Sequence, residues 1–211
     1  MDTIPGILFA VTNTDRDHQA AFNRWYDQRH VTQRLAMPGF TAARRFEAVD
    51  SPYQYMAVYD LVGIWAAFTP TYKALFELPI MSSEDREMLA RFWGIQRAVM
   101  QQIAVTGNPH PEPGSVGAVM AVALDPDPAF EDEFNDWYTT EHIVLGAAAP
   151  GVLRVRRFRA IEGEPRYLAL WEFSSVEAAR DPAFVAAIRT PWSARMQQHY
   201  RRVFRGLYRP R

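Results

Sequence analysis

A nine-residue segment occurs twice in this chain, and its repetition constrains the fold more than any other feature. Residues 22–30 read FNRWYDQRH and residues 134–142 read FNDWYTTEH, so each copy has a Trp-Tyr pair whose Tyr lies four residues before a His. His142 lies 112 positions after His30. Because Trp, Tyr and His are uncommon residues, this agreement indicates an internal duplication.

The same offset of 112 residues relates further positions. They are Pro38-Gly39 and Pro150-Gly151, Arg44-Arg45-Phe46 and Arg156-Arg157-Phe158, Tyr55 and Tyr167, and Pro79 and Pro191. We therefore divide the chain into a first repeat of residues 1–107, a Pro-rich linker of residues 108–114 and a second repeat of residues 115–211.

Hydrophobic periodicity predicts one order of elements for both repeats. In the first, strands are expected over residues 7–12, 40–49, 53–61 and 98–105, with helices over 18–35 and 65–75 and two or three short helical pieces over 76–91. In the second, strands are expected over 116–124, 152–161, 167–173 and 203–208, with helices over 128–145 and 176–188. Each repeat is β-α-β-β-α-β, the ferredoxin-like order, with an antiparallel four-stranded sheet and both helices on one face.

The expected strands are apolar on both sides of the pleat, as residues 7–11 and 119–124 illustrate. Helices cover only one face of each sheet, so the two uncovered faces must meet. We expect an α+β chain in which two tandem ferredoxin-like repeats pack their sheets face to face, with helices outside and a cavity between the sheets.

The composition excludes several classes of protein. The formal net charge is -1, which gives no general attraction to nucleic acid or to an anionic membrane surface, and no segment approaches the ~20 apolar residues of a membrane span. The N-terminus lacks the basic region of a signal peptide and is expected to be a strand. The chain has no Cys, which excludes disulfides and thiolate chemistry and fits a cytoplasmic protein. No His or carboxylate spacing typical of a metal site and no Gly-rich phosphate loop occurs, so neither a metal nor another cofactor is expected.

The motif residues support a resemblance. The segment WYTTEH at 137–142, followed by Pro150-Gly151 and Arg156-Arg157-Phe158, resembles the EthD-like branch of the dimeric α/β-barrel superfamily. The resemblance covers both repeats and implies a tandem fusion of two units that single-domain relatives bring together by dimerising; a homodimer of the fused chain is compatible with it. Superfamily members include monooxygenases, muconolactone-type isomerases, cyclases, dehydratases and haem-dependent enzymes, so the resemblance implies a fold more firmly than a reaction.

The duplicated helix supplies the candidate catalytic groups, because it carries an Asn, a Tyr and a His within one arc of the helix surface. They are Asn23, Tyr26 and His30 in the first repeat and Asn135, Tyr138 and His142 in the second. An imidazole with a near-neutral pKa can move a proton; alternatively, each His bonds a backbone carbonyl and holds the following loop. The first repeat has Arg29 where the second has Glu141, so if an acidic neighbour orients the His, the second repeat is the closer match to the family motif.

The paired arginines and the matching tyrosines supply candidate substrate-binding groups. They are Arg44, Arg45, Arg156, Arg157, Tyr55 and Tyr167. Since neighbours on a strand face opposite sides, one Arg of each pair should reach the space between the sheets. There it could hold a carboxylate or an enolate-like oxygen, or it could pair with carboxylates such as Asp60 and Glu172. The tyrosines could donate a phenolic hydrogen bond or serve only in packing.

These observations together predict a cofactor-independent enzyme that acts on a small apolar or aromatic oxygenated compound by proton transfer, as an isomerase, cyclase, dehydratase or decarboxylase. His142, and with it His30, would be the acid or base. A cofactor-free monooxygenase and a non-catalytic protein that binds a hydrophobic metabolite are the alternatives. Haem would require His199 or a motif His as its axial ligand.

Overall fold

The computed structural model describes residues 4–78, 80–112 and 114–211; residues 1–3, Pro79 of the expected Pro pair and residue 113 of the linker lie outside them. The strands are β1 (Gly6–Thr14), β2 (Phe40–Asp50), β3 (Tyr55–Leu61), β4 (Phe92–Gly107), β5 (Ala118–Pro126), β6 (Val152–Gly163), β7 (Tyr167–Phe173) and β8 (Tyr200–Pro210). The α-helices are α1 (Gln19–Trp25), α2 (Val31–Leu35), α3 (Pro70–Lys73), α4 (Ser83–Leu89), α5 (Glu131–Trp137), α6 (Ile143–Ala147), α7 (Pro182–Ala187) and α8 (Pro191–Met196). Among the described helices, none is long and apolar enough to cross a membrane.

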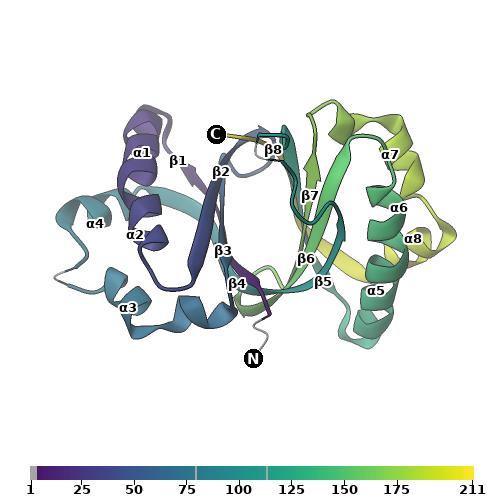
Figure 1. Ribbon diagram of the computed structural model, residues 1–211, viewed down its shortest axis with the longest axis horizontal. Helices are drawn as coiled ribbons and strands as arrows, with labels where there is room; N and C mark the ends of the chain where they lie inside the picture. Colours follow the sequence, from purple (N-terminus) through teal and green to yellow (C-terminus); the bar gives the residue numbers. More distant parts are fainter. Residues whose placement is uncertain (1–3, 79, 113) are drawn as a thin grey trace.

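The strands form one closed antiparallel barrel in the order β1-β3-β2-β8-β5-β7-β6-β4. Each repeat contributes four neighbouring strands, and the repeats join where β2 pairs with β8 and β4 with β6. The helices of the first repeat lie on one side of the barrel and those of the second on the other (Figure 1). The predicted fold class is therefore confirmed, with the addition that the two sheets are hydrogen-bonded at both edges. Strand β4 makes one of these joins because its 16 residues are long enough to pair with β1 and then with β6.

The barrel interior is mainly a packed core, which corrects the expectation of an open cavity between the sheets. Apolar side chains of both repeats fill it, among them Phe9, Phe46, Phe158, Leu170 and Tyr208. Such cores pack as densely as organic crystals, so little space remains within them. Among the described residues, the expected space between the sheets is present as a hollow of about 330 Å³ at the mouth of the barrel beside the linker.

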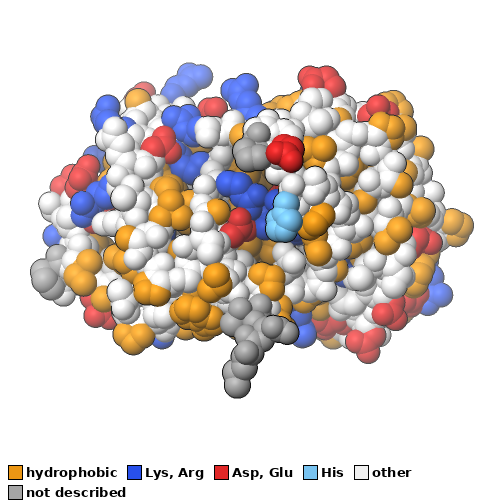
Figure 2. Space-filling view, viewed as in Figure 1, with side chains coloured by type: hydrophobic (Ala, Val, Ile, Leu, Met, Phe, Trp, Pro, Cys, Tyr) orange, Lys and Arg blue, Asp and Glu red, His pale blue; other side chains and the backbone are white. Residues whose placement is uncertain are grey.

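Five charged side chains cross the interior near this mouth. Arg156 donates to Asp60 at 2.7 Å and to Glu172 at 3.3 Å, so it links the two repeats. Arg44 bonds Asp60 at 2.5 Å, and Arg154 donates twice to Glu172, at 2.9 and 2.8 Å. Figure 2 shows Lys and Arg side chains near the centre of this view, between the repeats. Arg44 and Arg156 are thus the members of the two Arg pairs that face inward, where they form ion pairs with Asp60 and Glu172.

The duplicated helix differs from the regular helix expected over residues 18–35. A π-helical turn, Tyr26–His30, separates α1 from α2, and Tyr138–His142 separates α5 from α6 in the same way. In each case the backbone N–H after the His bonds the carbonyl of the motif Tyr, five residues earlier. The π turn changes which residues share a face, so the arc deduced for a regular helix does not hold across the His. Since π turns occur often at functional sites, their duplication draws attention to this segment.

Replacing Glu172 with Gln is expected to destabilise the chain by about 3–5 kcal/mol, because the buried carboxylate accepts hydrogen bonds from three guanidinium groups and its loss leaves buried charge unpaired. Urea unfolding of the variant measures this loss. The matched control is Glu47→Gln, which removes an exposed partner of Arg209 and should cost less than about 1 kcal/mol. Equal losses in the two variants would contradict a central role for the buried ion pairs.

Candidate functional site

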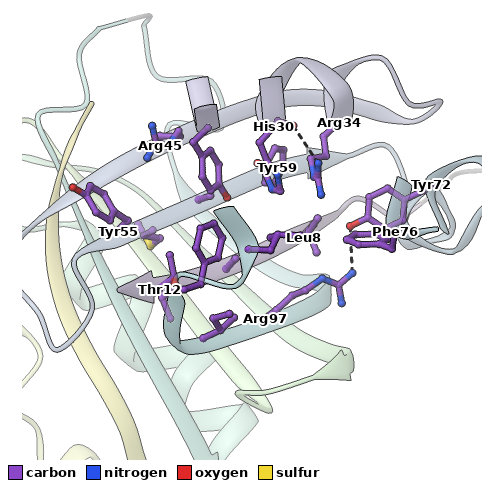
Figure 3. A pocket seen from close by; sticks show the side chains of 18 residues that line it. Leu8, Thr12, His30, Arg34, Arg45, Tyr55, Tyr59, Tyr72, Phe76 and Arg97 are labelled. Carbon is purple, nitrogen blue, oxygen red and sulfur yellow. Dashed lines mark hydrogen bonds between the residues drawn. The ribbon is translucent and has the colours of Figure 1, made fainter. Parts of the chain in front are cut away.

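An apolar cavity of about 190 Å³ lies in the first repeat, between the outer face of its sheet and its helices. Leu8, Ala57 and Tyr59 line it from the sheet, and Figure 3 shows His30 and Arg34 projecting toward it from the helix side. A cavity of roughly 150 Å³ can hold a benzene molecule. This space is therefore suited to a compound built on a single small ring, and it lies on the side of the sheet opposite to the one expected from the sequence.

His30 lies in the wall of this cavity and is buried. Its ring lies 4.6 Å from that of Trp25 and 4.5 Å from that of Tyr26, measured between ring centroids. Burial, together with the nearby positive charge of Arg34, lowers the pKa of His30 well below its ordinary value. The imidazole is therefore neutral at pH 7, whereas the sequence had suggested a pKa near neutrality.

Arg34 is a buried cation beside His30, with 5% of its surface exposed. Its guanidinium donates to the carbonyl of His30 at 3.4 Å and to the side chain of Gln33 at 3.3 Å, and it lies 5.6 Å from the ring centroid of Phe76. Among the residues that the structure describes, it forms no ion pair. Its charge therefore remains available to the cavity.

Three phenols complete the polar part of the wall. The Tyr59 hydroxyl is buried and has no hydrogen-bond partner; the Tyr26 phenol lies near it, without the geometry of a hydrogen bond. Burial raises the pKa of both groups, so both stay protonated at neutral pH. The Tyr72 hydroxyl accepts a hydrogen bond from Arg97 at 3.4 Å, as Figure 3 shows. The cavity thus combines an apolar floor with phenolic and cationic donors.

The predicted substrate-binding residues of the first repeat mainly hold the duplicated helix on the sheet. Arg45 donates to Asn23 at 2.7 Å, pairs with Asp27, and lies 4.3 Å from the ring centroid of Tyr26. Asn23 in turn donates to the Tyr55 hydroxyl at 3.1 Å. Arg45 and Tyr55 reach the cavity edge, but their polar groups are already engaged, so we assign them to positioning Tyr26 and His30.

The second repeat forms the same unit. Arg157 donates to Asn135 at 3.0 Å and to Thr139, and its guanidinium lies 4.4 Å from the ring centroid of Tyr138. Asn135 donates to the Tyr167 hydroxyl at 3.0 Å. The sequence therefore identified residues that do come together. The structure places Arg44 and Arg156 apart from them, on the opposite face of the sheet.

The cavity of the second repeat, about 160 Å³, lacks equivalents of the buried donors Arg34, Tyr59 and Tyr72; its own donors include Tyr138, Tyr200 and three exposed arginines, Arg189, Arg202 and Arg205. Trp171 stands where the first repeat has Tyr59, and Gly146 stands where it has Arg34. A Cβ on Gly146 would lie 2.4 Å from the Trp171 ring, so the indole occupies the space that a side chain would need. Phe184 replaces the phenol of Tyr72 in the same way.

His142 lies among aromatic rings in this second cavity. Its ring centroid is 4.6 Å from that of Trp137, 4.7 Å from that of Tyr138 and 5.6 Å from that of Trp171. Its Nδ1 atom is buried without a hydrogen-bond partner. Burial, assisted by the charge of Arg157, lowers the pKa of His142 to about 4.

The residue before each His has a structural partner outside the cavity. Arg29 forms a bidentate ion pair with Asp85 of α4, at 2.7 and 2.8 Å. Glu141 accepts a hydrogen bond from Thr190, at 2.5 Å, at the start of α8. The residue at this position is basic in one repeat and acidic in the other, but in both it connects the duplicated helix to the last helix of the repeat. The difference therefore does not make one His better oriented than the other.

Sequence analysis missed Arg34, Tyr59 and Arg97, whereas the many aromatic residues of the first repeat, Tyr72 among them, had suggested an apolar pocket wall there. Of the three missed residues, only Arg97 has an equivalent of the same type. Arg97 pairs with Ala10 across the sheet, and Arg205 pairs with Val122 in the same register, so the two arginines are equivalent at an offset of 108. The second repeat is shorter near its end. Aligning its last strand separately with the last strand of the first repeat would have revealed this pair of arginines.

Haem, which some members of the resembled superfamily use, does not fit the described residues. His199 stacks against Phe130 with ring centroids 3.6 Å apart; it lies outside both cavities and lines an open surface hollow beside Asp125 and Asp127. The two motif histidines face spaces comparable to one small ring, whereas a porphyrin contains four pyrrole rings. Within residues 4–78, 80–112 and 114–211, no three His, Asp or Glu side chains gather as a metal site.

Comparison of this chain with known proteins identifies structures that share its fold. No protein-family model and no curated protein matches the chain. Among solved structures, an anthrone oxidase-like protein matches 98% of this chain and 91% of its own, with a TM-score of 0.72 and 12% identity. The chain has the dimeric α/β-barrel fold.

A proposed monooxygenase from Fusobacterium nucleatum matches all of this chain and 94% of its own, with a TM-score of 0.64 and 12% identity. A chlorite dismutase from Candidatus Nitrospira defluvii matches all of this chain and 93% of its own, with a TM-score of 0.60 and 12% identity. Both halves of the barrel lie in tandem in this one chain.

The lowered pKa values of the two histidines predict a pH dependence of stability. An unfolded His titrates near 6.5, whereas folded His142 titrates at about 4. Between these values the unfolded chain binds a proton that the native chain does not, so the free energy of unfolding falls as the pH drops from about 6.5 toward about 4. Urea unfolding across this range should give a shallower slope for His142→Gln than for the wild type, with the remainder due in part to His30. His110→Gln, at an exposed position, is the control, and an unchanged slope in His142→Gln would contradict the prediction.

Proposed function

We propose that this chain is a cofactor-independent enzyme whose first repeat binds a small apolar or aromatic oxygenated compound and removes a proton from it. The observation that carries the proposal is the buried, neutral imidazole of His30 in the wall of the first cavity. A general base must be unprotonated before it acts, and His30 meets this condition at neutral pH. The sequence hypothesis gave His142 the leading role, but the donor groups of the first cavity favour His30.

The other wall residues suit the anion that such a step creates. When a C–H or O–H proton moves to His30, negative charge develops on a substrate oxygen as an enolate or phenolate. The Arg34 guanidinium and the free Tyr59 hydroxyl are donors that can stabilise it in a site of low polarity. Returning the proton to another atom of the same molecule gives isomerisation, and giving it to a departing hydroxyl, which leaves as water, gives dehydration. Decarboxylation forms the same anion by loss of CO₂ instead of a proton, and the anion then takes up a proton.

A cofactor-free monooxygenase is the second candidate. Two structures that share the fold are described as an anthrone oxidase-like protein and a proposed monooxygenase, and this description favours reaction of the substrate carbanion with O₂. Both candidates begin with the same proton abstraction. Oxygen consumption therefore separates them without changing the assignment of His30.

Replacing His30 with Gln is expected to lower the rate of proton abstraction by about 10²–10⁴-fold, because the variant keeps the side-chain volume and removes the base. Solvent deuterium exchange into a panel of monocyclic aromatic ketones and lactones, followed by NMR, measures abstraction before any product is known. An oxygen electrode on the same samples identifies the oxygenase. Because the pKa of His30 is lowered, the wild-type rate should stay constant down to pH 6.5 and fall only at lower pH.

The matched control is His142→Gln in the second repeat, which should leave the rate near that of the wild type. If the two variants were impaired equally, the assignment to the first repeat would be wrong. If compounds bind but none exchanges or consumes oxygen, the chain is a metabolite-binding protein instead.

A further inference from the structure

The first cavity has an unbalanced charge. Its wall includes the guanidinium-bearing residues Arg34, Arg45 and Arg97, and no Asp or Glu is among the described residues that line it. Arg45 is paired with Asp27, and Arg97 with Glu162 at 3.0 Å. Arg34 is the one cation of this wall without an ion pair among the described residues.

Keeping such a charge buried is costly. A buried cation without a counterion loses much of its hydration, and proteins ordinarily pair it or leave it at the surface. Arg34 is 5% exposed, and its contacts among described residues are the His30 carbonyl, the Gln33 amide and the Phe76 ring. The neutral acceptors only partly compensate the charge. An anion that enters the cavity would supply the missing counterion for Arg34.

A second, independent group points to the same kind of ligand. The Tyr59 hydroxyl is buried in the cavity wall and lacks a hydrogen-bond partner. Such an orphaned donor costs free energy unless a ligand bonds it. Tyr59 of β3 and Arg34 of α2 line the same cavity (Figure 3), and the charge of Arg34 acts on the Tyr59 hydroxyl, so one oxygen-bearing group can face both.

We propose that the first cavity binds a single-ring aromatic or apolar compound that carries an oxyanion, a carboxylate or a phenolate, against Arg34 and the Tyr59 hydroxyl. The inference rests on the proposed function for the choice of this cavity as the substrate site, and it names the substrate class. The second repeat has Gly146 and Trp171 at the two positions, and the arginines that line its cavity, Arg189, Arg202 and Arg205, are exposed. The buried pair of donors therefore occurs in one repeat only, and one bound molecule per chain is expected.

Calorimetric titration tests the proposal with benzoate, its neutral isostere benzamide, and 4-nitrophenolate. Benzoate or 4-nitrophenolate should bind the wild type with one site per chain, and benzamide about tenfold or more weakly, because a charge-assisted hydrogen bond exceeds a neutral one. Tighter binding of benzoate identifies the oxyanion as a carboxylate, and tighter binding of 4-nitrophenolate identifies it as a phenolate. Absence of binding by both anions at millimolar concentration, or equal affinity for benzoate and benzamide, would overturn the proposal.

Variants locate the anion. Arg34→Met should weaken anion binding about tenfold or more and weaken benzamide binding less, because benzamide loses a hydrogen bond but no ion pair, while Arg34→Lys should retain part of the anion affinity. Arg34→Met should also melt no lower than the wild type, because it removes an unpaired buried charge; this separates lost recognition from misfolding. Arg16→Met, at an exposed position of the same repeat, is the control. Unchanged benzoate affinity in Arg34→Met would contradict the assignment.

A spectroscopic measurement gives an independent result. The charges that act on His30 are Arg34 and Arg45, which lower its pKa, and Asp85, which raises it. An anion beside Arg34 offsets the first of these, so benzoate should raise the His30 pKa in an NMR titration and benzamide should not. His30→Gln is expected to bind benzoate normally. If it binds but proton exchange persists, the proposed function fails and the ligand class stands.

Discussion

Closure of the barrel is the constraint on which the rest of the structure depends. Each repeat brings a four-stranded sheet with apolar residues on both faces, and neither sheet can be covered by its own helices alone. Pairing β2 with β8 and β4 with β6 leaves no free edge and buries both inner faces in one core. Because most of that core is filled, the space beside the duplicated helices lies behind the sheets, and the space between the sheets is confined to the hollow at the mouth of the barrel.

The alternation of side chains along a strand then gives neighbouring arginines unrelated roles. Arg44 points inward to the ion pairs that join the repeats, whereas Arg45 points outward and holds the duplicated helix through Asn23 and Tyr26. The π turn in that helix carries His30 onto the cavity wall, where burial keeps it neutral. The barrel interior and the candidate site are therefore built from the two faces of the same strands.

The duplication made the fold predictable. Two copies of one pattern support the same order of strands and helices, and the apolar sheet face that the helices do not cover has to pack against another apolar face. It also pointed to His30 and to the Asn, Arg and Tyr that position it. The location of the cavity was not predictable, since periodicity shows that both faces of a strand are buried but not which side leaves space. Arg34 and Tyr59 were missed for a different reason: they occur in one repeat only, and a search for repeated residues does not find them.

Joining both halves of the barrel in one chain has a consequence for how the site can evolve. In a homodimer every substitution appears in both subunits, so a change that suits one pocket is imposed on the other. Here position 34 holds Arg while its counterpart at 146 holds Gly, and each matches its own surroundings. One half can thus specialise in chemistry while the other supplies the wall that closes the barrel. Two identical polypeptides could not differ in this way.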